Sequence, residues 1–114
     1  MARIEIPVYL INRDEFLPFD PVAGDITDGM FFAGNGGYTF LELENTGAGT
    51  FIVGAIINDN EVDEIVIPHK ELSLEPGTIA FFGPFPTNFY NQINSDVYID
   101  VEDASVLFNA FSVF

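Results

Sequence analysis

Apolar and polar residues alternate over short stretches of this chain, and the alternation predicts β-strands. Over residues 3–10 every second side chain is apolar, as expected for a strand with one buried face. Pro7 lacks an amide donor, which favours a sheet edge for this strand. Residues 38–44 repeat the alternation. Nowhere does the i, i+3, i+4, i+7 spacing of an amphipathic helix persist over three turns, so we expect an all-β fold.

Turn residues separate further strands at intervals of about eight to twelve residues. The nearly continuous apolar run at 51–57 predicts a central strand covered on both faces. The Gly-rich segment 34–37 predicts a hairpin turn, and the last two strands predict a closing hairpin. Phe89 and Tyr90 form either one helical turn or a strand end. These further strands are expected at 30–33, 50–58, 62–68, 72–74, 78–82, 96–101 and 106–114.

The pattern predicts one antiparallel β-sandwich domain over residues 1–114, jelly-roll or immunoglobulin-like, with seven to nine short strands and no substantial helix. A partly open barrel stays open as an alternative. Residues 12–28 form the longest predicted loop, and Phe16, Leu17 and Phe19 are apolar within it. These side chains either close an open end of the sandwich or anchor the chain in a neighbouring subunit. We therefore expect residues 1–33 to be a strand and loop arm that makes contacts.

The charge of the chain restricts its partners. The chain has eighteen acidic and three basic residues, which give a formal net charge of −15. Such a surface disfavours nucleic acid, which binds mainly through Lys and Arg, and disfavours anionic membranes. It suits a basic protein surface or, alternatively, simple solubility in a salty medium. The 13 Phe exceed what one small core comfortably buries, so we expect some aromatic surface to meet another chain. No apolar run reaches the length of a membrane span or a signal peptide core.

The residues that carry chemistry predict no enzyme and no cofactor. The chain has no Cys and a single His, His69, which rules out thiolate chemistry and multi-His ligation. Three carboxylate pairs have spacings that a strand or turn brings together, and we interpret them as solvated faces because a thin β domain rarely offers a deep cleft. The glycine-rich turn at 34–37 carries no Lys and opens a strand, unlike a phosphate loop. The pairs are Glu42/Glu44, Asp63/Glu64 and Asp100/Glu102.

One acidic segment invites comparison with a calcium loop. Residues 59–64 place side-chain oxygens at alternate positions. Glu64 occupies the sixth position, where an EF-hand needs Gly, and Lys70 occupies the twelfth, where it needs Glu. The segment is therefore not an EF-hand. An irregular Ca²⁺ site, either here or at Asp25 and Asp28, stays open.

Two groups of turn motifs resemble those of small phage proteins that decorate, or cement, an assembled capsid. The first is the Gly-rich turn at 34–37, the Thr39-Phe40-Leu41 strand and the Asn45-Thr46-Gly47 turn. The second is a Pro-Gly turn followed by Gly-Pro-Phe-Pro, Phe and Asn. The resemblance covers residues 34–114. The positions that carry its structural motif are Gly36, Asn45, Pro76, Gly77, Gly83, Pro84, Phe85, Pro86, Phe89 and Asn91.

The resemblance implies a virion protein that is synthesised in the host cytoplasm and binds the outer surface of the capsid. Its partner would be the major capsid protein, and such proteins often bind as trimers. Two other classes stay open: a phage tail or head-tail connector protein, and a carbohydrate-binding, adhesin-like module that uses Tyr38 and Tyr90 as platforms. The residues that we expect to contact the capsid or a neighbouring subunit are Phe16, Leu17, Phe19, Arg3, Glu5 and Arg13, together with the acidic strand faces.

Overall fold

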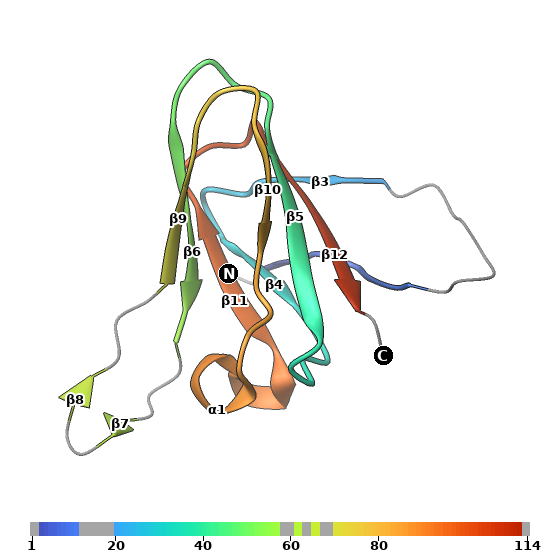
Figure 1. The fold of residues 1–114 in the computed structure, drawn as a ribbon, viewed down its shortest axis with the longest axis vertical. Helices are drawn as coiled ribbons and strands as arrows, with labels where there is room; N and C mark the ends of the chain where they lie inside the picture. Colours follow the sequence, from blue (N-terminus) through green and yellow to red (C-terminus); the bar gives the residue numbers. More distant parts are fainter. Residues whose placement is uncertain (1–2, 12–19, 58–60, 63–64, 67–69, 113–114) are drawn as a thin grey trace.

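The computed structural model describes residues 3–11, 20–57, 61–62, 65–66 and 70–112, and shows two β-sheets packed face to face (Figure 1). Strands make up 49% of the structure and helices 7%. The helices are one turn of α-helix, α1 (Thr87–Tyr90), and a short 3₁₀ segment, η1 (Ile93–Ser95). The predicted β-sandwich without substantial helix is confirmed.

Each of the two main sheets has five strands. The first sheet has the order β1 (Ile4–Glu5), β4 (Met30–Phe32), β11 (Val97–Val101), β6 (Phe51–Ile56) and β9 (Lys70–Leu74). The second sheet has the order β10 (Ile79–Phe82), β5 (Thr39–Asn45), β12 (Val106–Ser112) and β2 (Val8–Leu10), and β3 (Val22–Ala23) also pairs with β12. A small separate ribbon consists of β7 (Glu61–Val62) and β8 (Ile65–Val66).

The order of the strands is that of a jelly roll. From β3 to β12 through the two main sheets, every connection crosses from one sheet to the other except that between β6 and β9. Without β1 and β2, the strand orders of the two sheets are β10-β5-β12-β3 and β4-β11-β6-β9. An immunoglobulin-like sandwich would instead keep several consecutive strands within one sheet. Of the two predicted topologies, the strand order matches the double-sheet jelly roll.

The segment 3–10 forms two strands in different sheets, where one strand was predicted. β1 pairs with β4 and β2 pairs with β12, both in parallel, so the two sheets are mixed and not purely antiparallel as predicted. Between them Ile6 is fully buried, and its amide donates to the carbonyl of Phe31 at 2.7 Å. Pro7, which has no amide donor, marks the crossing. β1 and β2 both lie at sheet edges, as Pro7 predicted, but the chain supplies an edge to each sheet without reversing direction.

Two predicted hairpins are wrong. β4 and β5, joined by the Gly-rich segment 34–37, belong to different sheets, and so do β11 and β12. The strand count also exceeds the predicted seven to nine, since β1 and β2 are separate and β3 lies within the predicted loop 12–28. Alternation identifies which side chains of a strand are buried, but not which strand becomes its neighbour.

The apolar run at 51–57 is covered on one face only, which corrects the prediction of a strand covered on both. β6 is an interior strand, and its Val53 and Ala55 are fully buried. Ile52, on the other face, is 38% exposed. A jelly roll has two layers, so each sheet has one face against the core and one face outward.

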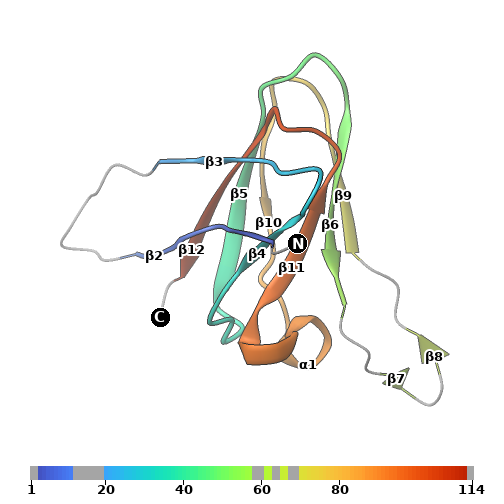
Figure 2. The same cartoon turned by 180° about the vertical axis from the view of Figure 1, so that it is seen from behind.

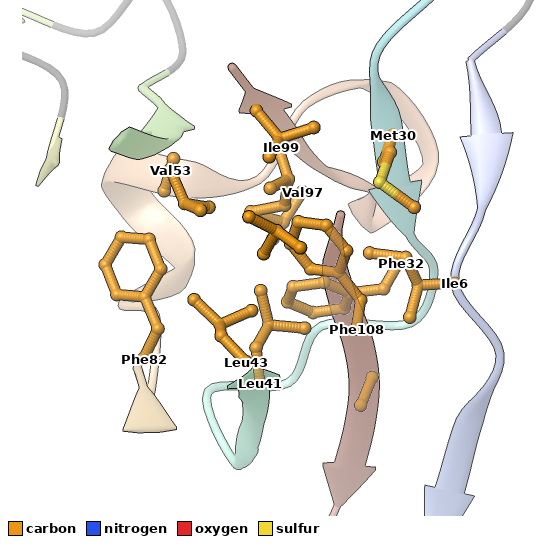
Figure 3. Packing of buried hydrophobic residues seen from close by; sticks show 14 of the residues in the cluster. Ile6, Met30, Phe32, Leu41, Leu43, Val53, Phe82, Val97, Ile99 and Phe108 are labelled. Carbon is orange, nitrogen blue, oxygen red and sulfur yellow. The ribbon is translucent and has the colours of Figure 1, made fainter. Parts of the chain in front are cut away.

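The core lies between the two sheets, and Figure 3 shows its side chains converging from both. Leu41 and Leu43 of β5 and Phe108 of β12 come from the second sheet, opposite Val53 and Ile99 of the first. All five are fully buried. Burial of each such side chain contributes about 1.5–3 kcal/mol. The burial of these side chains therefore supplies the main driving force for packing the two layers.

Candidate contact surface

A row of four aromatic rings crosses the outer face of the second sheet. We call it the aromatic strip: Tyr9 of β2, Phe111 of β12, Phe40 of β5 and Phe81 of β10. The ring centroids of Tyr9 and Phe111 are 6.5 Å apart, those of Phe111 and Phe40 5.7 Å, and those of Phe40 and Phe81 5.9 Å. These separations are typical of favourable aromatic pairs.

Strand register produces the aromatic strip. Phe111 lies opposite both Phe40 and Tyr9 in the sheet. Their neighbours Leu41 and Ala110 point into the core, so the three rings point outward. Phe111 is only 8% exposed because the flanking rings cover it, whereas Phe81, at the sheet edge, is 65% exposed.

Carboxylates border the exposed end of the aromatic strip. Glu42 and Glu44 lie on the same face of β5, opposite Phe81 and Ile79 of β10. Ile79 is 59% exposed. An exposed apolar patch beside acidic side chains is typical of a surface that meets another protein. This face is one of the acidic strand faces that we expected from the sequence to make contacts.

The remaining predicted contact residues are distributed unevenly. Phe16, Leu17, Phe19 and Arg13 lie outside the described residues. Glu5 is exposed on β1, at the edge of the first sheet.

Arg3, a predicted contact residue, makes its interactions within the chain. Its Nη1 donates to Oδ1 of Asp100 at 2.7 Å and to the carbonyls of Met30 and Ile99 at 3.3 Å. The guanidinium carbon lies 4.5 Å from the centre of the Tyr98 ring, within the range of a cation–π contact. Arg3 therefore fastens β1 to the first sheet.

The Gly-rich turn at 34–37 and the Gly-Pro-Phe-Pro segment, one motif from each group that carried the resemblance, meet at one end of the sandwich, near α1 (Figure 2). Asn35, in the Gly-rich turn, is 3% exposed. Its Nδ2 donates to the Phe85 carbonyl at 3.0 Å and to Oδ1 of Asn91 at 2.6 Å, while its Oδ1 accepts from the Gly37 amide at 3.1 Å. Nδ2 of Asn91 donates in return to the Asn35 carbonyl at 3.1 Å.

Phe85 closes this end of the core. It is 1% exposed, and its ring lies 5.6 Å from Phe32, 5.2 Å from Phe82 and 5.4 Å from Tyr90. Burial raises the pKa of the Tyr90 phenol above its ordinary value, and the ring packs against the core rather than standing free as a platform for sugars. Tyr38 is 54% exposed. The motif residues around Phe85 are Gly83 and Pro84, joined by a cis peptide bond, then Pro86, the half-buried Phe89 and the exposed Gly36.

A second buried Asn organises the opposite end of the sandwich. Asn45 is fully buried, and its Nδ2 donates to the carbonyls of Gly49 at 2.8 Å and Leu74 at 3.0 Å. Its Oδ1 accepts from the Gly47 amide at 2.9 Å, and its carbonyl accepts from the Gly77 amide at 2.9 Å. Asn45 thereby joins the 46–49 turn to the Pro76–Gly77 turn.

The described residues contain no group of three or more His, Cys, Asp or Glu side chains arranged to hold a metal ion. Asp25, a predicted calcium candidate, uses Oδ1 to accept from the amides of Thr27 and Asp28. His69 and the 59–64 segment lie largely outside the described residues. In the part of the chain that the structure describes, no helix is long and apolar enough to cross a membrane.

Comparisons with protein-family models, curated proteins and solved structures find no match to this chain. Sequence reasoning alone did not single out Asn35, or Phe81 with its neighbour Ile79. Asn35 had a local signal, because Asn-x-Gly, shared with Asn45, is typical of a side chain that accepts from the second following amide. The aromatic strip had none, since it depends on the register of four strands.

Proposed function

We propose that this protein is a structural component of a phage virion that binds the outer surface of the assembled capsid. It would stabilise the shell by clamping neighbouring major capsid subunits. The observation that carries the proposal is the outer face of the second sheet, where the exposed end of the aromatic strip lies beside Glu42 and Glu44. An apolar centre with a charged border is how protein interfaces are commonly built.

The electrostatics support an exterior position. A net charge of −15 disfavours contact with packaged DNA and favours basic coat surfaces. Repetition of a modest contact over a lattice raises the total affinity through avidity. A protein that binds the assembled shell but not free subunits stabilises the shell by mass action. Clamping therefore requires no catalytic group.

The test is gradient co-sedimentation of the purified protein with mature capsids stripped of it, with unexpanded procapsids as control. We expect saturable binding to mature shells in a fixed ratio to coat protein. Absence of binding to either shell contradicts the proposal and favours the tail-protein or glycan-binding classes.

Matched variants locate the contact. Charge reversal by Glu42→Lys with Glu44→Lys should weaken capsid binding, and Glu71→Lys, exposed on the outer strand of the other sheet, should leave it unchanged. Phe16→Ser with Phe19→Ser should abolish binding while the circular dichroism of the free protein stays the same. Collapse of the fold in that variant would assign those two side chains to the core.

A further inference from the structure

The free edge of β10 differs from the other edges of the two main sheets in the described part of the chain. β10 pairs with β5 alone, and its four residues, Ile-Ala-Phe-Phe, include no charge and no proline. In contrast, β9 carries Lys70 and Glu71, β1 carries Glu5, and β2 and β3 directly follow Pro7 and Pro21. Charges and prolines at edges prevent unwanted strand pairing. The β10 edge lacks this protection.

The backbone groups on this edge are free to pair. The Asn45 amide donates to the Thr78 carbonyl at 3.0 Å, which makes Glu44 and Ile79 a non-hydrogen-bonded pair of the antiparallel ladder. Alternation along the ladder then directs the amide and carbonyl groups of Ile79 and Phe81 away from β5. The same two residues have exposed side chains, at 59% and 65%. The edge of β10 thus exposes both unpaired backbone groups and apolar side chains.

We propose that β10 pairs antiparallel with β10 of a second copy of this chain, around a two-fold axis at Ala80. In this register Ile79 of each copy lies opposite Phe81 of the other, which makes two equivalent pairs. Each is a β-branched–aromatic cross-strand pair, a favourable combination. The opposed Ala80 residues are small enough for the closer approach of a non-hydrogen-bonded pair.

The β10 edge is self-complementary about Ala80, which favours a second copy as the occupant. A chain of net charge −15 repels its own copies, and a neutral strand is where two copies can approach with least repulsion. A basic partner would instead be attracted to the carboxylate-bearing faces. Pairing would place the outer faces of the two second sheets side by side and double the length of the aromatic strip. This assembly differs from the trimers that the resemblance implies, and it does not depend on capsid binding.

Sedimentation equilibrium of the full chain, from about 1 µM to about 1 mM, tests the proposal. We expect a monomer–dimer equilibrium in which added salt strengthens the dimer, because screening reduces the repulsion between copies. Ile79→Lys and Phe81→Lys should each raise the dissociation constant at least about tenfold, although both reduce the negative charge. Ile52→Lys, an exposed apolar site on an interior strand of the other sheet, should leave it unchanged.

Hydrogen exchange of the unmodified protein provides a test that does not depend on variants folding. The amides of Ile79 and Phe81 should become protected as protein concentration rises, in step with the dimer fraction. A monomer at all concentrations and salt levels, a trimer, or a dimer with no change in protection at these amides would overturn the proposal. Capsid binding by a strictly monomeric protein would overturn it while leaving the proposed function standing.

Discussion

The side-chain Nδ2 of Asn35 donates to Oδ1 of Asn91 at 2.6 Å and joins two loops that are 56 residues apart in the chain. Asn35 also holds the Phe85 carbonyl, and Phe85 closes the core at this end. Asn35 therefore links the β4–β5 corner to residues on both sides of α1.

Removal of the Asn35 side chain should destabilise the fold. Asn35→Ala leaves the Phe85 carbonyl and the Gly37 amide without their partner, and we expect a loss of about 2–4 kcal/mol in the free energy of unfolding. Asn91→Ala should cost less, and the double variant should show coupling of about 1 kcal/mol. Urea denaturation measures all three. The exposed Ser73→Ala, expected to change stability by less than about 0.5 kcal/mol, is the control. Strict additivity would show that the two side chains act independently.

Asn45 should tolerate loss of its amide group poorly. Asn45→Asp keeps the acceptor for the Gly47 amide but places a carboxylate against the carbonyl oxygens of Gly49 and Leu74. We expect it to be more destabilising at pH 7 than Asn45→Ala, by about 1 kcal/mol or more. Because a buried carboxyl prefers its neutral form, the difference should shrink toward pH 4. Equal stability of the two variants at pH 7 would contradict the donor role of Nδ2.

Asp103 should contribute to the acid sensitivity of the fold. Hydrogen bonds from the side chain and then the amide of Ser105 hold the pKa of Asp103 below its ordinary value of 3.8. A depressed pKa stabilises the folded state above pH 3.8, and this contribution is lost as pH falls through the folded-state pKa. Thermal melting between pH 6 and pH 2 should therefore decline less steeply for Asp103→Asn than for the unmodified chain. Parallel curves would assign the acid transition to other carboxylates.

Two glycines with the same backbone conformation test the packing of Arg3. Gly29 and Gly77 have φ of 75° and 74°, so alanine strains both equally, by about 1 kcal/mol. A Cβ on Gly77 meets nothing within 4 Å, whereas one on Gly29 meets Nη1 of Arg3 and Oδ1 of Asp100. We expect Gly29→Ala to cost about 1 kcal/mol more than Gly77→Ala in thermal or urea unfolding. Prior replacement of Arg3 by Met should remove most of that excess.

The alternation over residues 38–44 was sufficient to predict which side chains of that strand are buried. Leu41 and Leu43 face the core as the pattern requires, because successive side chains of a strand point to opposite faces whatever their neighbours. Pro7 likewise predicted an edge, and the Pro76–Gly77 turn separates β9 from β10. These features depend on local geometry alone. The alternation over residues 3–10 was wrong for Ile4 and Leu10, which are 40% and 63% exposed on edge strands.

Tertiary structure decided which strands become neighbours. The pairing of Phe40 with Phe111, the meeting of Asn35 with Asn91, and the engagement of Arg3 by Asp100 all join residues far apart in the chain. Two predicted hairpins became crossings between sheets because alternation favours burial equally well in either sheet. The sequence by itself determined the all-β class and the buried face of the strand at 38–44, and packing of the whole chain determined the contact surface.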